Sequence, residues 1–234
     1  MVTAAPSQRD ALAALTGEII ECCACSRLVE WRESVAHERR AAFRNEEYWG
    51  RPLPGFGDPQ ARLLLVGLAP AAHGGNRTGR IFTGDRSGDW LFGSLYRTGY
   101  ANQPTSVRRD DGLELRDAYV TAAVRCAPPL NKPTPDERDR CLTYLVRELE
   151  LLEGVRVIVP LGQFAYDAAA RVLTAAGSPL PVPRPRFGHG VEVRTGRAVV
   201  LCCFHPSQQN TFTGKLTETM LDEIFVRARE LSDE

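Results

Sequence analysis

The segment Gly67–Arg80, GLAPAAHGGNRTGR, combines glycines with one histidine, one asparagine and two arginines directly behind the apolar run Ala61–Val66. A strand that ends in a glycine-rich turn is a common way for an α/β fold to present backbone N–H groups to an anion or a ring. The second glycine of G-x-G-x-x-G is absent, and no glycine-lysine pair follows at the spacing of a P-loop. The segment therefore predicts a ligand loop whose ligand must be inferred from the rest of the chain.

A second polar segment, HPSQQNTFTGKLT, follows another apolar run and begins at His205. A lone histidine is more often structural than catalytic. Here hydroxyl and amide side chains, starting with Ser207, follow it and are of the kind that contact a phosphodiester. The predicted start of a helix near Lys215 also favours an anion. We interpret His205–Thr217 as a second candidate ligand loop.

The cysteines form two spaced pairs, Cys22 with Cys25 and Cys126 with Cys141, which could supply four thiolates to one centre. An ordinary surface pair or a redox dithiol is the alternative for Cys22-x-x-Cys25 taken alone. Zinc and a four-iron cluster both accept four thiolates, and the spacing does not choose between them. A metal centre at this position would attach an N-terminal helical segment to the body of the fold.

Four short apolar runs predict buried strands, and helical patterns lie between them. Strands that alternate with helices indicate a parallel sheet with helices on both faces, whose ligands bind at the carboxyl ends of the strands. Each run is followed there by polar residues or glycines. The predicted strands are Leu63–Gly67, Ala118–Val124, Val155–Leu161 and Ala198–Phe204, and the predicted helices lie within 8–45 and at Asp89–Thr98, Pro135–Leu152, Gln163–Ala176 and Lys215–Leu231.

Length and composition favour one α/β domain, 1–234, in which residues 1–47 form a helical segment that carries two of the four paired cysteines. Lysine plus arginine equals aspartate plus glutamate at 29 each, so no global positive field indicates a polyanion partner, although a local basic face is allowed. The polar N-terminus and the absence of a long apolar window predict a cytoplasmic protein that does not enter a membrane. We expect a monomer.

Taken together, GLAPAAHGGNRTGR with the following IFTGDRSG, and HPSQQNTFTGKLT, resemble the two signature motifs of the family 5, or type b, uracil-DNA glycosylases. The cysteines at 22, 25, 126 and 141, with APPLNKPTP between the last two, resemble the [4Fe-4S] ligands of that superfamily. The resemblance implies a three-layer α/β sandwich around a four-stranded, mainly parallel sheet, which agrees with the four apolar runs. It also implies base excision repair of double-stranded DNA by base flipping.

The resemblance implies roles for individual residues. His205 would hydrogen-bond the carbonyl oxygen beside the scissile N-glycosidic bond and stabilise the leaving base. Phe82 would stack on the flipped base, and Ser207 would bind a flanking phosphate. Most relatives carry an acidic residue early in the first motif, where this chain has Leu68 and Ala69, so the water-positioning role falls to Asn76 or Asp85. The remaining pocket residues are expected to be Gly67, Ala69, Pro70, Ala71 and Asn131, and the phosphate-binding cations to be Arg77, Arg80, Arg86, Arg125 and Lys215.

The sequence TAAVRC has alanines where type a relatives have an asparagine, so a roomier pocket is expected. By the resemblance, the substrates would be uracil, hypoxanthine and ethenocytosine in duplex DNA. The absence of a lysine from either motif at a Schiff-base position predicts a monofunctional glycosylase that does not cut the strand. The alternative is a catalytically weak DNA-lesion binding module of the same fold.

Overall fold

The computed structural model describes residues 7–234 and contains a six-stranded mixed sheet with the order β1-β3-β2-β4-β6-β5. The four predicted strands form its parallel centre. The expectation of a four-stranded sheet is wrong at the two edges, where a short strand pairs antiparallel on each side. The strands are β1 (Phe56–Gly57), β2 (Leu63–Gly67), β3 (Ala118–Ala122), β4 (Val157–Pro160), β5 (Glu192–Arg194) and β6 (Val199–Leu201).

The parallel centre forms because its strands are apolar on both faces, as expected for a sheet that is covered by helices on both sides. Every residue of β2, β3, β4 and β6 is buried. In the central register Leu64 lies opposite Tyr119 on one side and Ile158 on the other. All four carboxyl ends therefore meet at one edge of the sheet.

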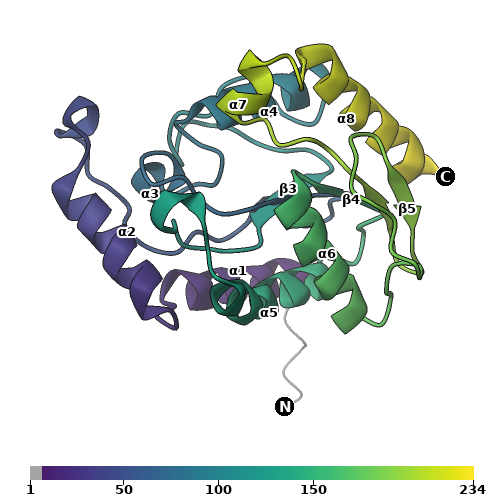
Figure 1. Ribbon diagram of the computed structural model, residues 1–234, viewed down its shortest axis with the longest axis horizontal. Helices are drawn as coiled ribbons and strands as arrows, with labels where there is room; N and C mark the ends of the chain where they lie inside the picture. Colours follow the sequence, from purple (N-terminus) through teal and green to yellow (C-terminus); the bar gives the residue numbers. More distant parts are fainter. Residues whose placement is uncertain (1–6) are drawn as a thin grey trace.

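Helices form a layer on each face of the sheet (Figure 1). The first face carries α4 and α8, which contact each other, and the second carries α1, α5 and α6. The longer helices are α1 (Gln8–Ile20), α2 (Ser26–Glu38), α4 (Arg86–Arg97), α5 (Pro135–Leu151), α6 (Gln163–Ala175) and α8 (Glu218–Asp233). The short ones are α3 (Gly75–Thr78), α7 (Gln208–Phe212) and the 3-10 turns η1 (Ala41–Phe43) and η2 (Pro129–Asn131).

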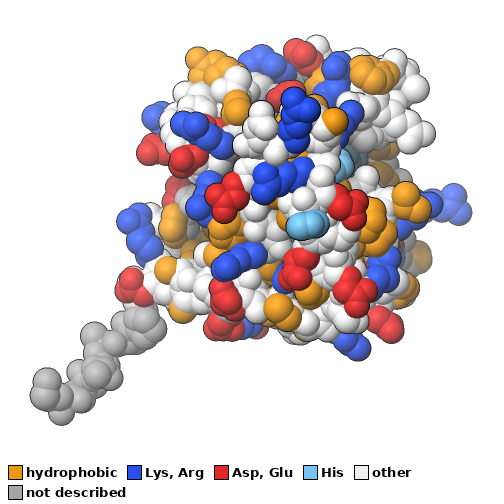
Figure 2. Space-filling view, turned by 90° about the vertical axis from the view of Figure 1, so that its left-hand side faces the viewer, with side chains coloured by type: hydrophobic (Ala, Val, Ile, Leu, Met, Phe, Trp, Pro, Cys, Tyr) orange, Lys and Arg blue, Asp and Glu red, His pale blue; other side chains and the backbone are white. Residues whose placement is uncertain are grey.

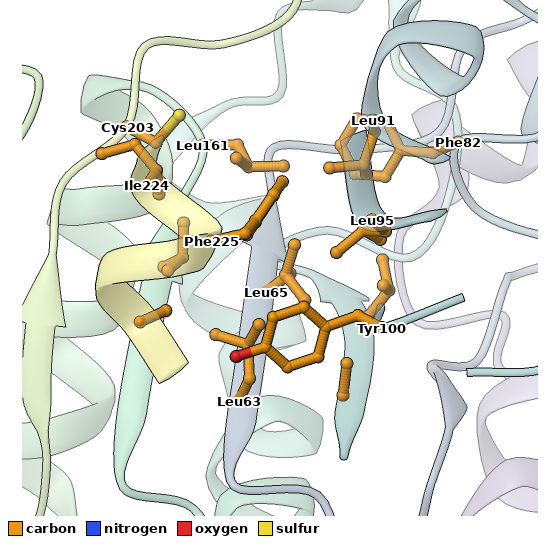
Figure 3. Packing of buried hydrophobic residues seen from close by; sticks show 14 of the residues in the cluster. Leu63, Leu65, Phe82, Leu91, Leu95, Tyr100, Leu161, Cys203, Ile224 and Phe225 are labelled. Carbon is orange, nitrogen blue, oxygen red and sulfur yellow. The ribbon is translucent and has the colours of Figure 1, made fainter. Parts of the chain in front are cut away.

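Each helix layer encloses its own hydrophobic core. The core under α4 and α8 includes Phe82, Leu91 and Phe225, and Figure 3 shows Phe82 at its end beside Leu91. The second core lies under α5 and α6 and includes Tyr166 and Leu149. Phe82 thus belongs to a packed core and also lies near the carboxyl edge of the sheet.

The predicted N-terminal helical segment is interrupted at the first cysteine pair. Helix α1 ends at Ile20, and α2 begins after Cys25, which is its N-cap residue. Helix α5 begins at a capping box, in which the Thr134 hydroxyl accepts from the Glu137 N–H and the Glu137 carboxylate accepts from the Thr134 N–H. The same carboxylate accepts two hydrogen bonds from Arg27, which attaches α2 to α5.

No helix among residues 7–234 is long and apolar enough to cross a membrane.

Candidate active site

A pocket of about 440 Å³ opens at the carboxyl edge of the sheet. It receives residues from the loop after β2, from the start of α4, from η2 and from the segment after β6. Its lining residues are Leu68, Ala69, Ala71, Ile81, Phe82, Asp85, Ser87, Asn131, His205, Ser207, Gln208 and Gln209. Both candidate ligand loops therefore reach one cavity, together with the loop after β3.

The structure places seven of the ten predicted catalytic and substrate-binding residues on this pocket: Ala69, Ala71, Phe82, Asp85, Asn131, His205 and Ser207. Gly67, Pro70 and Asn76 do not line it. Ile81 and Ser87 line it without having been predicted. Ser87 lies two residues after Asp85 in the first turn of α4. It was missed because the sequence predicted that this helix begins at residue 89.

Phe82 and His205 face each other in the pocket, with ring centroids 5.9 Å apart and an interplanar angle of 36°. Phe82 has a positive φ of 52°, an unusual conformation for a bulky residue. Its ring lies directly over Gly67, where an added Cβ would come within 2.8 Å of a ring carbon. Gly67, at the end of β2, therefore permits the Phe82 ring to approach the strand. The role of Gly67 is thus structural, since it supports a side chain that lines the pocket.

The surroundings of His205 favour its neutral form. Burial lowers the pKa of His205 to about 4. Its backbone carbonyl accepts hydrogen bonds from the N–H of Ser207 and from the amide of Asn210, which fix the turn that follows β6. Among the described residues, no hydrogen bond to the imidazole itself is found, so its ring nitrogens are free to bind a ligand.

Asp85 is the N-cap residue of α4, and its Oδ1 accepts from the Gly88 N–H at 3.0 Å. Burial raises the pKa of Asp85 above its ordinary value, and the N–H groups of Gly88 and Ser87 act in the opposite direction. The carboxylate lies against Gly74 of the first loop, where an added Cβ would come within 2.2 Å of Oδ2. The loop after β2 thus fixes the position of Asp85, the only carboxylate that residues 7–234 bring to the pocket.

Asn76 serves a structural contact outside the pocket. Its side chain is fully buried, and its Nδ2 donates to the Arg32 carbonyl of α2 at 3.1 Å. Its backbone carbonyl accepts from the Gly50 N–H at 3.0 Å. These bonds attach the first candidate loop to α2 and to the chain at Gly50.

Five cations were predicted to bind phosphate, and this prediction is wrong for three of them. Arg77, Arg80 and Arg125 are 8%, 6% and 1% exposed, and each forms an ion pair with a carboxylate of the chain, Glu46, Asp111 and Glu148 respectively. Figure 2 shows basic and acidic side chains interspersed over the face that carries α2.

The other two predicted cations, Arg86 and Lys215, are exposed and lie over the rings of Phe212 and Phe204. Lys132, which follows Asn131 on the rim of the pocket, is exposed as well. The cations available at the mouth of the pocket are therefore few and isolated.

The four paired cysteines, Cys22, Cys25, Cys126 and Cys141, line a second cavity of about 330 Å³. N–H donors point at two of the sulfurs: Arg32 Nη1 lies 3.1 Å from Cys126 Sγ, and the Arg125 backbone N lies 3.2 Å from Cys141 Sγ. Such donors stabilise thiolates and tune the metal that they bind. The donor set thus fits a thiolate-bound centre.

Within residues 7–234, no group of three or more His, Cys, Asp or Glu side chains is arranged to hold a single metal ion. The other three cysteines do not line the cavity, since Cys202 and Cys203 are buried in the sheet region and Cys23 is exposed.

Comparisons with known proteins show the family of the chain. Residues 54–229 match the model of the uracil DNA glycosylase superfamily. A type-5 uracil-DNA glycosylase of Mycobacterium bovis is 54% identical over 220 residues, which cover 93% of this chain and 81% of that protein. Type-5 uracil-DNA glycosylases of Mycobacterium leprae and Thermus thermophilus are 51% and 49% identical, over 93% and 90% of this chain and 94% of each of those proteins.

The fold and the pocket therefore define a protein of the uracil DNA glycosylase superfamily, and within it the chain belongs to the type-5 uracil-DNA glycosylases.

Replacing Gly74 by alanine is expected to displace Asp85, because the new methyl group would meet Oδ2 at 2.2 Å and the Asp85 Cβ at 3.0 Å. We expect Gly74→Ala to lower the free energy of unfolding by about 1–3 kcal/mol, as overpacking does. The control is Gly93→Ala in α4, where the nearest atom is Arg97 Nη1 at 3.4 Å and the helix gains from alanine. Denaturant unfolding of both variants measures the difference, and equal effects would contradict this account of Gly74.

Proposed function

We propose that this chain hydrolyses the N-glycosidic bond of uracil and other deaminated or damaged bases in double-stranded DNA. The observation that carries the proposal is the position of the His205 imidazole, which faces Phe82 across a pocket that also holds Asp85. The pocket lies in a fold whose relatives are named uracil-DNA glycosylases. A base inside a duplex cannot reach such a cavity, so the target nucleotide must be flipped out of the stack.

The leaving base gains negative charge as the N-glycosidic bond breaks, and His205 is placed to bind it. A neutral imidazole can donate one N–H to the carbonyl oxygen beside the scissile bond without first losing a proton. In a pocket walled by Ala69, Ala71 and Phe82 this hydrogen bond is little screened by water. Its strength grows with the charge on the base, so it lowers the barrier rather than only binding the ground state.

The sugar gains positive charge in the same step, and Asp85 is the carboxylate that can balance it. Its Oδ1 is held by the α4 N-terminus, and the carboxylate lines the pocket, where it could accept a proton from water or stabilise the cation. Asn76 is a poorer candidate for this role, because its amide donates to Arg32 away from the pocket. We therefore assign water positioning to Asp85 and a structural role to Asn76.

A broad substrate range is supported by the small side chains of the pocket wall. Specificity for one base edge usually depends on a side-chain amide held against that edge. The small side chains Ala69 and Ala71 line the pocket, β3 ends at Ala122 without contributing a lining amide, and the lining amides of the described chain, Asn131, Gln208 and Gln209, come from surface segments. Hypoxanthine and ethenocytosine should therefore enter together with uracil.

The pocket and its mouth also bear on the type of glycosylase. No lysine is among the lining residues of the described chain, so a Schiff base with the sugar has no candidate amine and the enzyme should leave the strand uncut. Ser207, Arg86, Lys132 and Lys215 are the groups available to bind the flanking phosphates. We propose that a single domain acts as a monomer on the duplex.

The second cavity would hold a [4Fe-4S] cluster through Cys22, Cys25, Cys126 and Cys141. The proposal rests on four thiols around one cavity and on the two N–H donors aimed at their sulfurs. The choice of a cluster rather than zinc follows the resemblance of these four cysteines to the [4Fe-4S] ligands of the superfamily, since both centres accept four thiolates. The cluster would attach α2 to the loop after β3 and to α5.

Base release under single-turnover conditions tests the assignment. His205→Ala is expected to slow the release of uracil, hypoxanthine and ethenocytosine from duplexes by about 100–1,000-fold, as the loss of one oxyanion donor does. Asp85→Asn is expected to slow it by about 100-fold or more. Asn76→Ala should act mainly through stability. His37→Ala, at the exposed end of α2, is the control.

If the unsubstituted protein binds these duplexes and releases none of the bases, the chain is a lesion-binding module instead. If Asn76→Ala loses more activity than Asp85→Asn at equal stability, the assignment of water positioning to Asp85 is wrong.

The dependence of the rate on pH tests the neutral state of His205. With a pKa of about 4, the imidazole stays neutral from pH 8 to about 6, so the rate of base release should be flat there and fall only at more acidic pH. In the unfolded chain the pKa of a histidine is about 6.5, so between about pH 6.5 and 4 the unfolded state binds a proton that the folded state does not. The contribution of His205 to the free energy of unfolding is therefore lost as the pH falls from about 6.5 to 4. Circular dichroism shows where the fold persists, and a rate that rises below pH 6.5 would mean that the imidazolium is the active form.

The cluster has a direct spectroscopic test. Protein purified without oxygen should absorb near 400 nm and contain about four iron and four sulfide per chain. Cys126→Ser should lose most of this iron, whereas Cys23→Ser, whose side chain is exposed, should retain it. If the protein contains one zinc per chain and no sulfide, the four cysteines bind zinc and the cluster proposal is wrong.

A further inference from the structure

The hydrogen bonds that hold His205 in the described chain go to its backbone. On the side that follows it, the Ser207 N–H and the Asn210 amide both donate to the His205 carbonyl, at 2.8 Å and 2.9 Å. On the side that precedes it, the sheet ends early, since β6 stops at Leu201 and Cys203 forms only an isolated bridge. The residue directly before His205 therefore lies beyond the strand.

The N–H of that residue, Phe204, is bound by a side chain from another segment. It donates to Nδ1 of His189 at 3.2 Å, so an imidazole takes the place that a neighbouring strand would have in the sheet. The His189 ring also packs on the Phe204 ring, with centroids 5.1 Å apart and an interplanar angle of 33°. The chain is thus fixed by hydrogen bonds one residue before His205 and at His205 itself.

The turn that carries His189 is attached to the strand that leads to His205. The Gly190 N–H donates to the Cys202 carbonyl at 2.8 Å, and the Cys202 N–H donates to the Val191 carbonyl at 2.9 Å. Gly190 has a φ of 76°, which glycine adopts without strain. Strand β5 begins two residues further on and pairs with β6. The pairing of these two strands therefore sets the position of His189.

The bond to Phe204 requires one particular protonation state of His189. Because Nδ1 accepts, the imidazole must be neutral and carry its proton on Nε2. Burial lowers the pKa of His189, which favours the neutral form, whereas a hydrogen bond to the Met220 backbone and the charge of Glu223 act in the opposite direction. Both residues belong to α8, so the imidazole lies between the end of β6 and the start of that helix.

We propose that His189 is a positioning residue for His205: its Nδ1 fixes the backbone before His205, so that the His205 imidazole stays where it can donate to the leaving base. The inference rests on the proposed glycosylase function. His189 is not among the residues of the described chain that line the base pocket, so it acts through His205. The bond from His205 to the base depends on distance and direction, and a displacement of about 1 Å can slow a reaction by about 100-fold.

Two substitutions separate the acceptor from the ring of His189. His189→Phe keeps a ring against Phe204 and removes Nδ1, so the Phe204 N–H loses its partner. His189→Asn removes the ring and brings a side-chain oxygen to about the position of Nδ1. At saturating protein, His189→Phe is expected to slow single-turnover release of uracil by about 10–100-fold. His189→Asn, which keeps an acceptor, should stay within about threefold of the unsubstituted rate.

The dependence of the rate on protein concentration separates positioning from DNA binding. The concentration that gives half of the maximal rate should change by less than about twofold in both variants, because the lost interaction acts on the reaction rather than on the bound duplex. The matched control is His37→Phe at the exposed end of α2, which should change neither quantity.

A double-mutant cycle tests whether His189 acts through His205. With His205→Ala in place, no imidazole remains to be positioned, so the addition of His189→Phe should slow base release by less than about twofold further. A defect unrelated to His205 would slow both backgrounds by the same factor. Denaturant unfolding gives the folded fraction of each variant. If His189→Phe does not fold, His189→Leu, which also lacks an acceptor, replaces it in the cycle.

The outcomes separate the positioning role from the proposed function. Equal slowing in the two backgrounds, a His189→Asn variant as slow as His189→Phe, or full activity of His189→Phe would overturn the positioning role. An unsubstituted protein that releases no base would instead overturn the proposed function.

Discussion

The buried ion pair between Arg125 and Glu148 is the interaction on which both cavities depend. The two side chains are 2% and 1% exposed, and the Glu148 carboxylate also accepts from the Thr121 hydroxyl of β3 and the Gly55 N–H. The Arg125 backbone N–H donates to Cys141 Sγ. Breaking such a pair leaves an uncompensated charge in the interior and costs about 3–5 kcal/mol. The pair thereby fixes the end of β3 on α5 and sets where the following turn η2 begins.

A second set of contacts connects the cysteine cavity with the base pocket. Arg32 donates to Cys126 Sγ and to the Cys22 carbonyl, and its own carbonyl accepts from the Asn76 amide. Arg32 is buried and its Nε has no partner in the described chain, while its Nη2 lies 3.6 Å from the Glu33 carboxylate. The thiolates of a bound cluster would supply negative charge beside it. Displacement of α2 would therefore reach the loop after β2 that packs against Asp85.

The sequence was sufficient to predict the parallel centre of the sheet, because its strands are buried on both faces and appear as continuous apolar runs. The edge strands β1 and β5 were missed, since the first has two residues and the second exposes two of its three. Phe82 and His205 were predicted as pocket residues from motifs that follow strands, and both line the cavity, while their roles stay predictions. Asn76 illustrates the opposite case, because a motif does not reveal which polar side chains turn inward to contact a distant helix.

The prediction that the arginines of the first motif bind phosphate was wrong for a related reason. A guanidinium in a loop motif suggests phosphate binding, yet Arg77 and Arg80 find carboxylates 31 residues away in sequence in opposite directions, at Glu46 and Asp111. Only tertiary structure creates such pairs. Once these charges are neutralised internally, electrostatic attraction contributes less to DNA affinity than a count of motif arginines implies. The described residues bring few exposed cations to the pocket, so the proposed opening of a duplex there relies more on the shape of the pocket than on charge.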